Sequence, residues 1–538
     1  MMRQMVVYLM GMFLLAGCKK VETVVDKGTA EQTLLMSIGP YFTTLDPQLM
    51  TLASDMHVAR ALFEGLLSPD PKDLHPVPGV AESWEMSKDG LTYTFHLRPE
   101  ARWSNGERLT AGDFVFSYKR ILSAALGSES ANFLYVIKNG AAYHKKEIED
   151  FSAVGVRALD DHTLQFTLEN RTPYFLTLIL NPAWYPVHEK TLLQCGAIDQ
   201  RDSSWTQVGR IITNGPFVLK SLKPDEKIIL EKNLHYWGAK DVRLRKIHFL
   251  LIPDMNTEER AFRDHQLHIT ENVPFPQILK YVKKHSPHLK ISPYLGTYCY
   301  VYNTTQAPLN DVRVRKALSM AINRRIIVGT DRVMCKYRAA YTFVPENTAN
   351  YTNPKRIVED IELAKKLLAD AGYPNGQGFP KITLTFNTSE SHRFNAEVIQ
   401  EMWKKNLNID VQLTNLECKD MFARRRQKQF QITRGPGIGD YNDATSFLNM
   451  WESRSVNNYS GWSNARYDEC LRLASLTESS DERLKLLQEA ETLLLNEMPL
   501  LILHSNNVTH LVDTSVKNWY PNILDWHPYQ SIYLESSK

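Results

Sequence analysis

One stretch in the second half of the chain constrains the fold more than any other. Residues 381–386 alternate apolar and polar side chains as a strand does, and a helical stretch carrying Trp403 follows. Residues 409–413 alternate again, which predicts a second strand directly after that helix. The order strand, helix, strand is typical of α/β architecture, and it predicts an α/β domain that begins near residue 297.

The first third of the chain carries a different pattern. Leu91, Tyr93, Phe95 and Leu97 alternate with polar residues, and a similar alternation follows at 164–168. These patterns predict a β-rich block. Residues 500–503 predict a late strand that returns between domains, and a length of 538 residues favours about three domains.

Charge and motifs exclude several classes of function. The 63 Lys and Arg residues nearly balance the 60 Asp and Glu residues, which argues against a nucleic-acid partner. The sequence contains no His-Glu-x-x-His, Gly-x-Ser-x-Gly or Walker A pattern. We therefore expect a binding protein with no catalytic residues and no cofactor, and an envelope hydrolase is disfavoured.

The N-terminus predicts export. Residues 1–3 supply a positive region, and residues 5–15 form an apolar run that is too short to span a bilayer as a helix. The run ends in Leu-Ala-Gly-Cys18, which resembles a bacterial lipobox. The resemblance implies that Cys18 is lipidated and attaches the protein to a membrane; a short uncleaved anchor is the alternative.

The remaining cysteines show no pairing pattern. These five cysteines are far apart in sequence and odd in number, which favours free thiols: Cys195, Cys299, Cys335, Cys418 and Cys470. One long-range disulfide bridge between two of them stays possible in an exported protein.

A glycine-rich stretch, Arg434-Gly-Pro-Gly-Ile-Gly-Asp440, lies between a strand-like and a helix-like segment. Glycine and proline at this density exclude a helix or a regular strand. Three interpretations stay open from the residues alone: a plain connection, a phosphate cradle and a ligand site. The cradle lacks the Lys-Ser/Thr that a P-loop needs.

Two further clusters have simple interpretations. His265 and His268 would face the same side of a helix and would then form a weak metal site, with no other ligand in view. The basic run 424–428 is typical of a solvated helix face.

Ten phrases, in order along the chain, resemble the extracytoplasmic oligopeptide-binding proteins of ABC importers, family 5 of the solute-binding proteins. They include Leu62-Phe-Glu-Gly-Leu66, Pro78-Gly-Val-Ala-Glu-Ser-Trp84, Trp103-Ser-Asn-Gly106, Asn310-Asp-Val-Arg-Val-Arg315 and Asp440-Tyr-Asn-Asp443.

The resemblance implies an α/β, two-lobed periplasmic binding protein of the cluster C type, with an extra β-rich domain inserted in the first lobe. The expected division is a signal peptide with lipobox at 1–18, a tether at 19–31, lobe I at 32–63, 191–296 and 504–538, the inserted domain at 64–190, and lobe II at 297–503.

The resemblance also implies a peptide lying extended between the lobes. Asp440 matches the aspartate that binds the peptide amine. The positions that match residues binding the carboxylate are Arg434, Arg425, His392 and Arg332. Ala53, Ser54 and Asp55 match a first-lobe strand whose backbone faces the peptide in the family. Gly435 and Gly437 would also contribute backbone to the cleft, because glycine would allow the ligand backbone to approach closely.

Two positions depart from the family. Gly437 stands where the family has a Trp, and Pro436 removes an N–H from a loop that normally pairs with peptide. Both are expected to widen the pocket and to change ligand length and class.

The leading hypothesis is a lipid-anchored, monomeric receptor that binds short peptides and delivers them to the permease and ATPase subunits of an ABC importer. The alternative is a binding protein of the same fold for murein peptide, haem or nickel chelate. An envelope chaperone is a third hypothesis.

Overall fold

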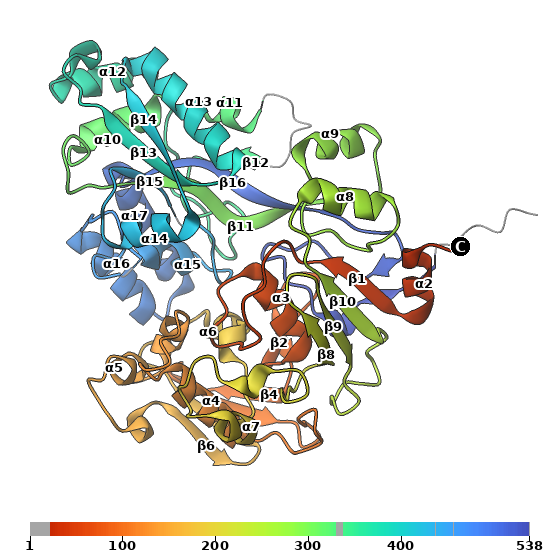
Figure 1. Cartoon of the computed structure of the whole chain (residues 1–538). Helices are drawn as coiled ribbons and strands as arrows, with labels where there is room; N and C mark the ends of the chain where they lie inside the picture. The colour runs from red at the N-terminus through yellow and green to blue at the C-terminus, as the bar shows by residue number, and fades with distance from the viewer. Residues whose placement is uncertain (1–21, 330–336, 436, 456, 537–538) are drawn as a thin grey trace, which may run out of the picture.

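The computed structural model describes residues 22–329, 337–435, 437–455 and 457–536. It has two lobes, and a third, β-rich part packs below them (Figure 1). None of the helices in these ranges is both long and apolar enough to cross a membrane.

Lobe I is built on a four-stranded sheet in the order β1-β10-β9-β8. The β8–β9 hairpin is the one that the Lys-Pro-Asp-Glu turn at 223–226 predicts, and β1 pairs in parallel with β10. The elements of lobe I are β1 (Thr33–Ser37), α3 (Ala53–Leu62), β8 (Phe217–Lys223), β9 (Lys227–Lys232), β10 (Lys246–Leu250), α8 (Met255–Arg263), α9 (Phe275–Lys283), β17 (Val516–Lys517) and β18 (Tyr533–Leu534).

The inserted domain contains a second four-stranded sheet, β4-β5-β7-β6, with α4 packed on it. The alternation at 91–97 and 164–168 therefore predicted its two central strands. Its elements are β2 (Leu67–Pro69), β3 (Pro76–Pro78), β4 (Ala81–Met86), β5 (Thr92–Leu97), α4 (Ala111–Ile121), α5 (Gly140–His144), β6 (Val156–Asp160), β7 (Thr163–Thr167), α6 (Phe175–Leu178) and α7 (Glu189–Cys195).

Lobe II has a six-stranded mixed sheet, β12-β16-β11-β15-β13-β14. β13 and β14 are parallel and joined by α13, as the strand-helix-strand order predicts. Its elements are α10 (Val312–Met320), α11 (Arg324–Val328), β12 (Tyr337–Ala339), α12 (Ile361–Asp370), β13 (Ile382–Asn387), α13 (Glu390–Leu407), β14 (Val411–Leu416), α14 (Cys418–Arg426), β15 (Ile432–Arg434), α15 (Thr445–Leu448), α16 (Ala465–Leu476) and α17 (Ser480–Glu497).

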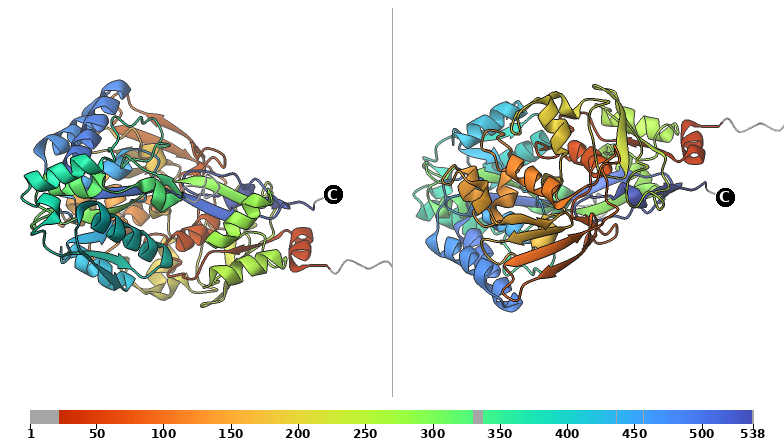
Figure 2. Two further views of the ribbon diagram at one scale, coloured as in Figure 1. Left: turned by 90° about the horizontal axis from the view of Figure 1, so that it is seen from above. Right: turned by 90° about the horizontal axis from the view of Figure 1, so that it is seen from below.

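Two long antiparallel strands connect the lobes: β11 (Leu289–Tyr302) and β16 (Leu500–Leu511). Leu289 pairs with Leu511 at the lobe I end, and Val301 pairs with Leu500 inside lobe II. Their pairing slips after Pro293 and again after Tyr298, which leaves the ladder irregular midway. Both views in Figure 2 show this strand pair running between the lobes.

The predicted tether at 19–31 is wrong over its second half. Residues 24–31 form a helix, α2 (Val24–Glu31), which starts at a capping box between Thr23 and Asp26. Val25 and Gly28 are buried against lobe I, and Gln32 bonds to the Leu534 carbonyl near the C-terminus (2.6 Å). Figure 2 shows α2 at the same end of the molecule as the C-terminus. The other predicted domain boundaries stay predictions.

Candidate functional site

The glycine-rich stretch continues the line of β15 alongside β11. The Gly435 N–H donates to the Cys299 carbonyl (2.9 Å), and the Gly439 N–H donates to the Leu295 carbonyl (2.9 Å). Between them, the Thr297 N–H donates to the Gly437 carbonyl. The stretch is thus an extended segment that pairs with β11, the strand that links the lobes. It is therefore not a plain connecting loop.

The three glycines are required by this pairing. A Cβ on Gly435 would lie 2.9 Å from the Cys299 sulfur, and one on Gly439 would lie 2.8 Å from side-chain atoms of both Leu295 and Phe447. A Cβ on Gly437 would collide with the Thr297 carbonyl oxygen. Packing inside the protein therefore already accounts for the absence of side chains at these positions, and close approach of a ligand to the backbone of Gly435 and Gly437 stays a prediction.

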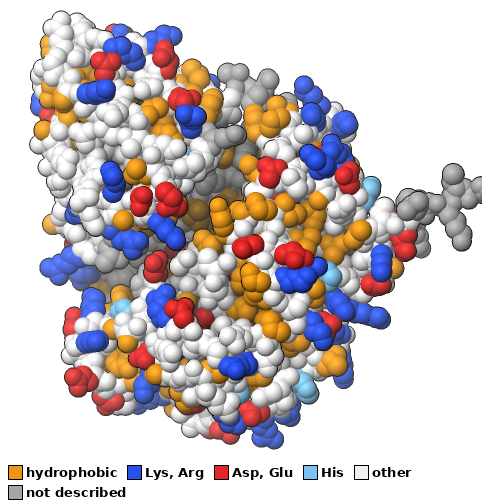
Figure 3. Space-filling view, in the orientation of Figure 1, with side chains coloured by type: hydrophobic (Ala, Val, Ile, Leu, Met, Phe, Trp, Pro, Cys, Tyr) orange, Lys and Arg blue, Asp and Glu red, His pale blue; other side chains and the backbone are white. Residues whose placement is uncertain are grey.

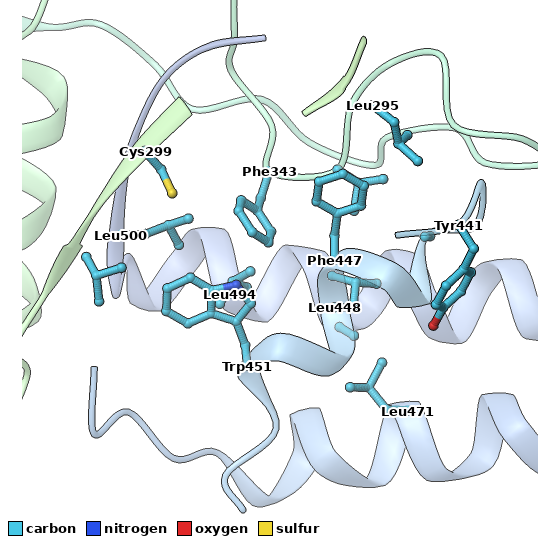
Figure 4. Close-up of a cluster of buried hydrophobic side chains, with 14 of the residues drawn as sticks. Leu295, Cys299, Phe343, Tyr441, Phe447, Leu448, Trp451, Leu471, Leu494 and Leu500 are labelled. Carbon is cyan, nitrogen blue, oxygen red and sulfur yellow. The ribbon is translucent and has the colours of Figure 1, made fainter. Parts of the chain in front are cut away.

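Figure 4 shows the buried cluster against which the glycines pack. Leu295 and Cys299 come from β11, while Phe447 and Leu448 come from α15, the short helix after the stretch. Tyr441 lies at the edge of this cluster. The cluster therefore fixes the position of the stretch through contacts on the side where the glycines lack side chains.

The side chains between the glycines face the other way. In an extended segment alternate residues point to opposite sides, and Gly435, Gly437 and Gly439 are buried while Ile438 and Asp440 are exposed and Arg434 is half-buried. The stretch therefore presents a cationic, an apolar and an anionic side chain along one edge. At about 3.3 Å per residue, Arg434 and Asp440 lie about 20 Å apart.

Asp440 is reached by solvent but surrounded by protein. Desolvation raises the pKa of its carboxyl to about 6. Its backbone N–H donates to the Ser446 hydroxyl (2.8 Å), which holds the turn, and the structure shows no hydrogen bond to the carboxylate from any described residue. An accessible carboxylate in a partly desolvated position is well suited to a cationic group of a ligand.

At the opposite end, two arginines lie together. The Arg425 guanidinium donates to the Arg434 carbonyl (3.3 Å) and lies over the rings of Phe422 and Tyr459. Burial lowers the pKa of Arg425, and its buried Nε has no hydrogen-bond partner among the described residues. Arg434 donates to the Asn387 side chain (2.7 Å).

No carboxylate of the described ranges forms an ion pair with either Arg425 or Arg434. Their charge is therefore available to an anion, and a guanidinium fits a carboxylate with two parallel hydrogen bonds.

His392 lies beside these arginines. Its Nδ1 is 3.0 Å from the Tyr298 hydroxyl, and burial, helped by the charge of Arg434, lowers its pKa to about 4. A neutral imidazole at this position contributes a hydrogen bond rather than a charge. The structure thus brings together three of the four residues predicted at the carboxylate end, whereas Arg332, like Pro436 and Cys18, lies outside the described residues.

The predicted first-lobe strand at 53–55 is wrong. Ala53, Ser54 and Asp55 form the first turn of α3, whose residues from Val58 to Leu62 are buried. The Asp55 carboxylate accepts hydrogen bonds from the backbone N–H (2.8 Å) and the hydroxyl (2.5 Å) of Thr43. Asp55 therefore fixes a neighbouring loop of its own lobe.

The histidine pair is not a metal site in this conformation. α8 ends before it, His265 is exposed in a left-handed turn, and His268 is buried. Both ring nitrogens of His268 are engaged: Nδ1 accepts from the Leu35 N–H (3.1 Å), and Nε2 lies 3.2 Å from the Thr29 hydroxyl. The feature that suggested haem or a nickel chelate is thereby removed.

Among the described cysteines, Cys195, Cys418 and Cys470 are free thiols. Cys335 lies outside the described residues.

Two tyrosines belong to the site but were not predicted. Tyr298 bonds to His392, and Tyr294 lies near Asp440, whose negative charge contributes to raising the Tyr294 pKa. The aromatic alternation of 294–302 was visible in the sequence, but it indicated only a strand. The pairing of β11 with the glycine-rich stretch places these residues beside the candidate site.

Comparison with known proteins gives concordant results. Residues 75–459 match the family model described as bacterial extracellular solute-binding proteins, family 5. The chain is 34% identical over 524 residues to the periplasmic oligopeptide-binding protein OppA of Salmonella typhimurium, covering 94% of this chain and 92% of that protein.

Two solved structures of the murein tripeptide-binding protein MppA also match at 33% identity, and the first of them is the Escherichia coli protein. One superimposes with a TM-score of 0.83, covering 93% of this chain and 98% of that one. The unliganded open form superimposes with a TM-score of 0.74, covering 94% and 97%. The present conformation is therefore closer to the first than to the open form.

Proposed function

Since the chain belongs to family 5 of the bacterial extracellular solute-binding proteins, we propose that it captures short peptides between its lobes and passes them to an ABC importer. The observation that carries this proposal is the placement of Asp440 and Arg434 on one edge of the glycine-rich stretch. Six residues separate them, which corresponds to about 20 Å in an extended chain. The two unlike charges match the two ends of a zwitterionic, extended ligand. Backbone pairing would give affinity with little side-chain selection.

The spacing bounds the ligand. An extended peptide advances about 3.3 Å per residue, so about six residues is the longest that fits between the two charges. Ile438, half exposed between the charges, would contact an apolar ligand side chain.

Calorimetry with tri-alanine tests this assignment. We expect tri-alanine to bind the wild-type protein and not to bind Asp440→Ala. We also expect N-acetylated tri-alanine not to bind the wild-type protein. Each change removes one partner of a desolvated charge pair. Asp241→Ala is the matched control, since Asp241 is exposed in lobe I far along the chain from the site. Unchanged affinity in Asp440→Ala would refute the assignment of the amine site.

A murein tripeptide is a second candidate ligand. It is supported by the superposition on MppA. The expectation that Gly437 widens the pocket is wrong in this structure, because a side chain there would point at the Thr297 carbonyl and not into a pocket. Native mass spectrometry of the protein as purified from its own envelope distinguishes the candidates by the mass of the released ligand.

The remaining parts of the assignment concern the location. We propose a monomer in the cell envelope, held to a membrane through a lipidated Cys18, with transporter subunits as partners. Metabolic labelling with a fatty acid, lost in Cys18→Ser, tests the anchor.

A further inference from the structure

The inserted domain reaches lobe II next to the amine site. The ring of Tyr174, just before α6, stacks on Tyr441 with centroids 4.9 Å apart and an interplanar angle of 9°. The Arg483 guanidinium lies 5.7 Å from the same Tyr174 ring. A third contact, from Arg171 to Glu478 (3.6 Å), is exposed and adds little.

These contacts fall on residues that hold Asp440. Tyr441 directly follows it in sequence, and its hydroxyl lies 3.3 Å from the Thr445 hydroxyl. Asp443 accepts from both Thr445 and Arg483 (2.6 and 2.8 Å), in a buried ion pair with the arginine. The turn 440–446 is thus closed on itself by hydrogen bonds, and Tyr174 packs against its outer side.

A cavity of about 1050 Å³ lies between the inserted domain and lobe II, lined by Trp84 and Tyr93 of the inserted domain and by Tyr351 and Leu484 of lobe II. Asp443 and Arg483, which take part in the contacts described above, also line this cavity. The Tyr174 stack therefore lies at the edge of a region where the two domains are separated.

Buried polar contacts also join the inserted domain to lobe I. A buried ion pair joins Arg120 to Asp46 (2.6 Å), and Glu64 accepts hydrogen bonds from Tyr236 and Trp237 (2.6 Å each). Lobe II is connected to lobe I only through β11 and β16 and the chain around them in the described ranges. Opening about this strand pair would carry Tyr174 away from Tyr441.

We propose that Tyr174 is a positioning residue for the amine site: closure of the lobes stacks it on Tyr441, orients Asp440 through the turn, and slows ligand release. The inserted domain would then take part in ligand capture without touching the ligand. This inference rests on the proposed peptide-binding function.

A contact made only in the closed state stabilises that state and hence the bound complex. Losing an aromatic stack and a cation–π contact is expected to weaken tri-alanine binding about tenfold in Tyr174→Ala. The loss should lie in a faster dissociation rate, with the association rate nearly unchanged. Tyr174→Phe keeps the ring but loses the hydroxyl, which forms side-chain hydrogen bonds with Thr445 and Tyr441, so its loss should be smaller than that of Tyr174→Ala.

Stopped-flow fluorescence and calorimetry provide the test, with melting temperature and binding stoichiometry measured in parallel. Tyr135→Ala is the matched control, because Tyr135 is a half-buried tyrosine of the same domain that lies beside His144, away from lobe II. Dissociation that is faster in Tyr174→Ala than in Tyr174→Phe, and unchanged in Tyr135→Ala, supports the proposal if the stoichiometry is full.

Wild-type dissociation kinetics in Tyr174→Ala would overturn it, as would equal losses in Tyr174→Phe and Tyr174→Ala. If the alanine variant does not fold, Tyr174→Leu provides the same comparison against Phe. Failure of the wild-type protein to bind any peptide would instead refute the proposed function, so the two failures are distinguishable.

Discussion

At the scale of single residues, the site depends on charges that the protein leaves uncompensated. The Asp440 carboxylate and the Arg425–Arg434 pair have no ion-pair partner among the described residues, although each lies within the protein interior or at its edge. Holding partly desolvated charges costs stability, and a ligand that supplies the missing partner recovers that cost as affinity.

The raised pKa of Asp440 predicts a pH-dependent affinity. Peptide amines bind the carboxylate form, and with a pKa of about 6 this form is nearly complete at pH 7.5. At pH 5, one unit below that pKa, about a tenth of the carboxyl is ionised, so Kd for tri-alanine should rise about tenfold.

Binding near pH 6 should also release a proton, since the bound ammonium lowers the pKa of Asp440. Calorimetry in two buffers with different ionisation enthalpies measures both effects. A Kd that is constant from pH 7.5 to pH 5 would contradict this role of Asp440.

Arg434 is predicted to recognise the free carboxylate. Wild-type protein should prefer hexa-alanine to hexa-alanine amide, since a peptide of about six residues spans the two charges and only the acid pairs with the guanidinium. Arg434→Gln should lose about 2 kcal/mol with the acid and much less with the amide. Competition binding with the four combinations gives the coupling energy, and equal losses for acid and amide would exclude a direct contact.

At the scale of elements, the patterns with regular periodicity were predictable and the long-range contacts were not. β13 and β14 were predicted to within a few residues, and α13 was predicted as a helical stretch that carries Trp403, because alternation and helical spacing are local properties. Helix α2 was missed because its residues are mostly polar, although Thr23 and Asp26 carry a capping-box spacing. The resemblance assigned residues 53–55 to a strand, but the buried face of α3 extends to them.

In the glycine-rich stretch, too, the local structure was predictable from the sequence and the long-range contacts were not. Its composition correctly excluded a helix or a regular strand, and the resemblance located the charged residues. The partner of its glycines, β11, is distant in sequence and could not be inferred from local pattern. For this reason the glycines were assigned to the ligand rather than to Leu295, Thr297 and Cys299.

We predict that Gly437 cannot be replaced, because a side chain there would collide with β11. In Gly437→Ala the new methyl group meets the Thr297 carbonyl, so the stretch must move off β11 and carry Asp440 with it. We expect a loss of about 2 kcal/mol in unfolding free energy and of most tri-alanine binding.

Gly112→Ala is the matched control, because a Cβ there makes only an ordinary contact with Thr110 inside α4, where alanine favours the helix. Urea unfolding and calorimetry of both variants test the prediction. A Gly437→Ala protein with wild-type stability and affinity would show that the stretch adapts.

At the scale of the whole molecule, ligand binding and lobe closure are linked through one strand pair. β11 belongs to the linkage between the lobes, borders the glycine-rich stretch and contributes Tyr298 to the carboxylate end. The face seen in Figure 3 carries acidic and basic side chains intermingled, so no single-sign surface selects the ligand there. Specificity then depends on the charged groups inside the cleft.

The last prediction concerns closure itself. A ligand can shift the equilibrium between open and closed forms only by its differential affinity for them, and the closed form alone brings Asp440 and the lobe I side of the cleft together around a peptide. Saturating tri-alanine should therefore reduce the radius of gyration of the wild-type protein in small-angle X-ray scattering. Asp440→Ala should show no change at the same ligand concentration, and Tyr174→Ala should close only at higher concentration. If the ligand-free wild-type protein already scatters as a closed form, the closed state is populated before binding, and peptide would then contribute to retention rather than to closure.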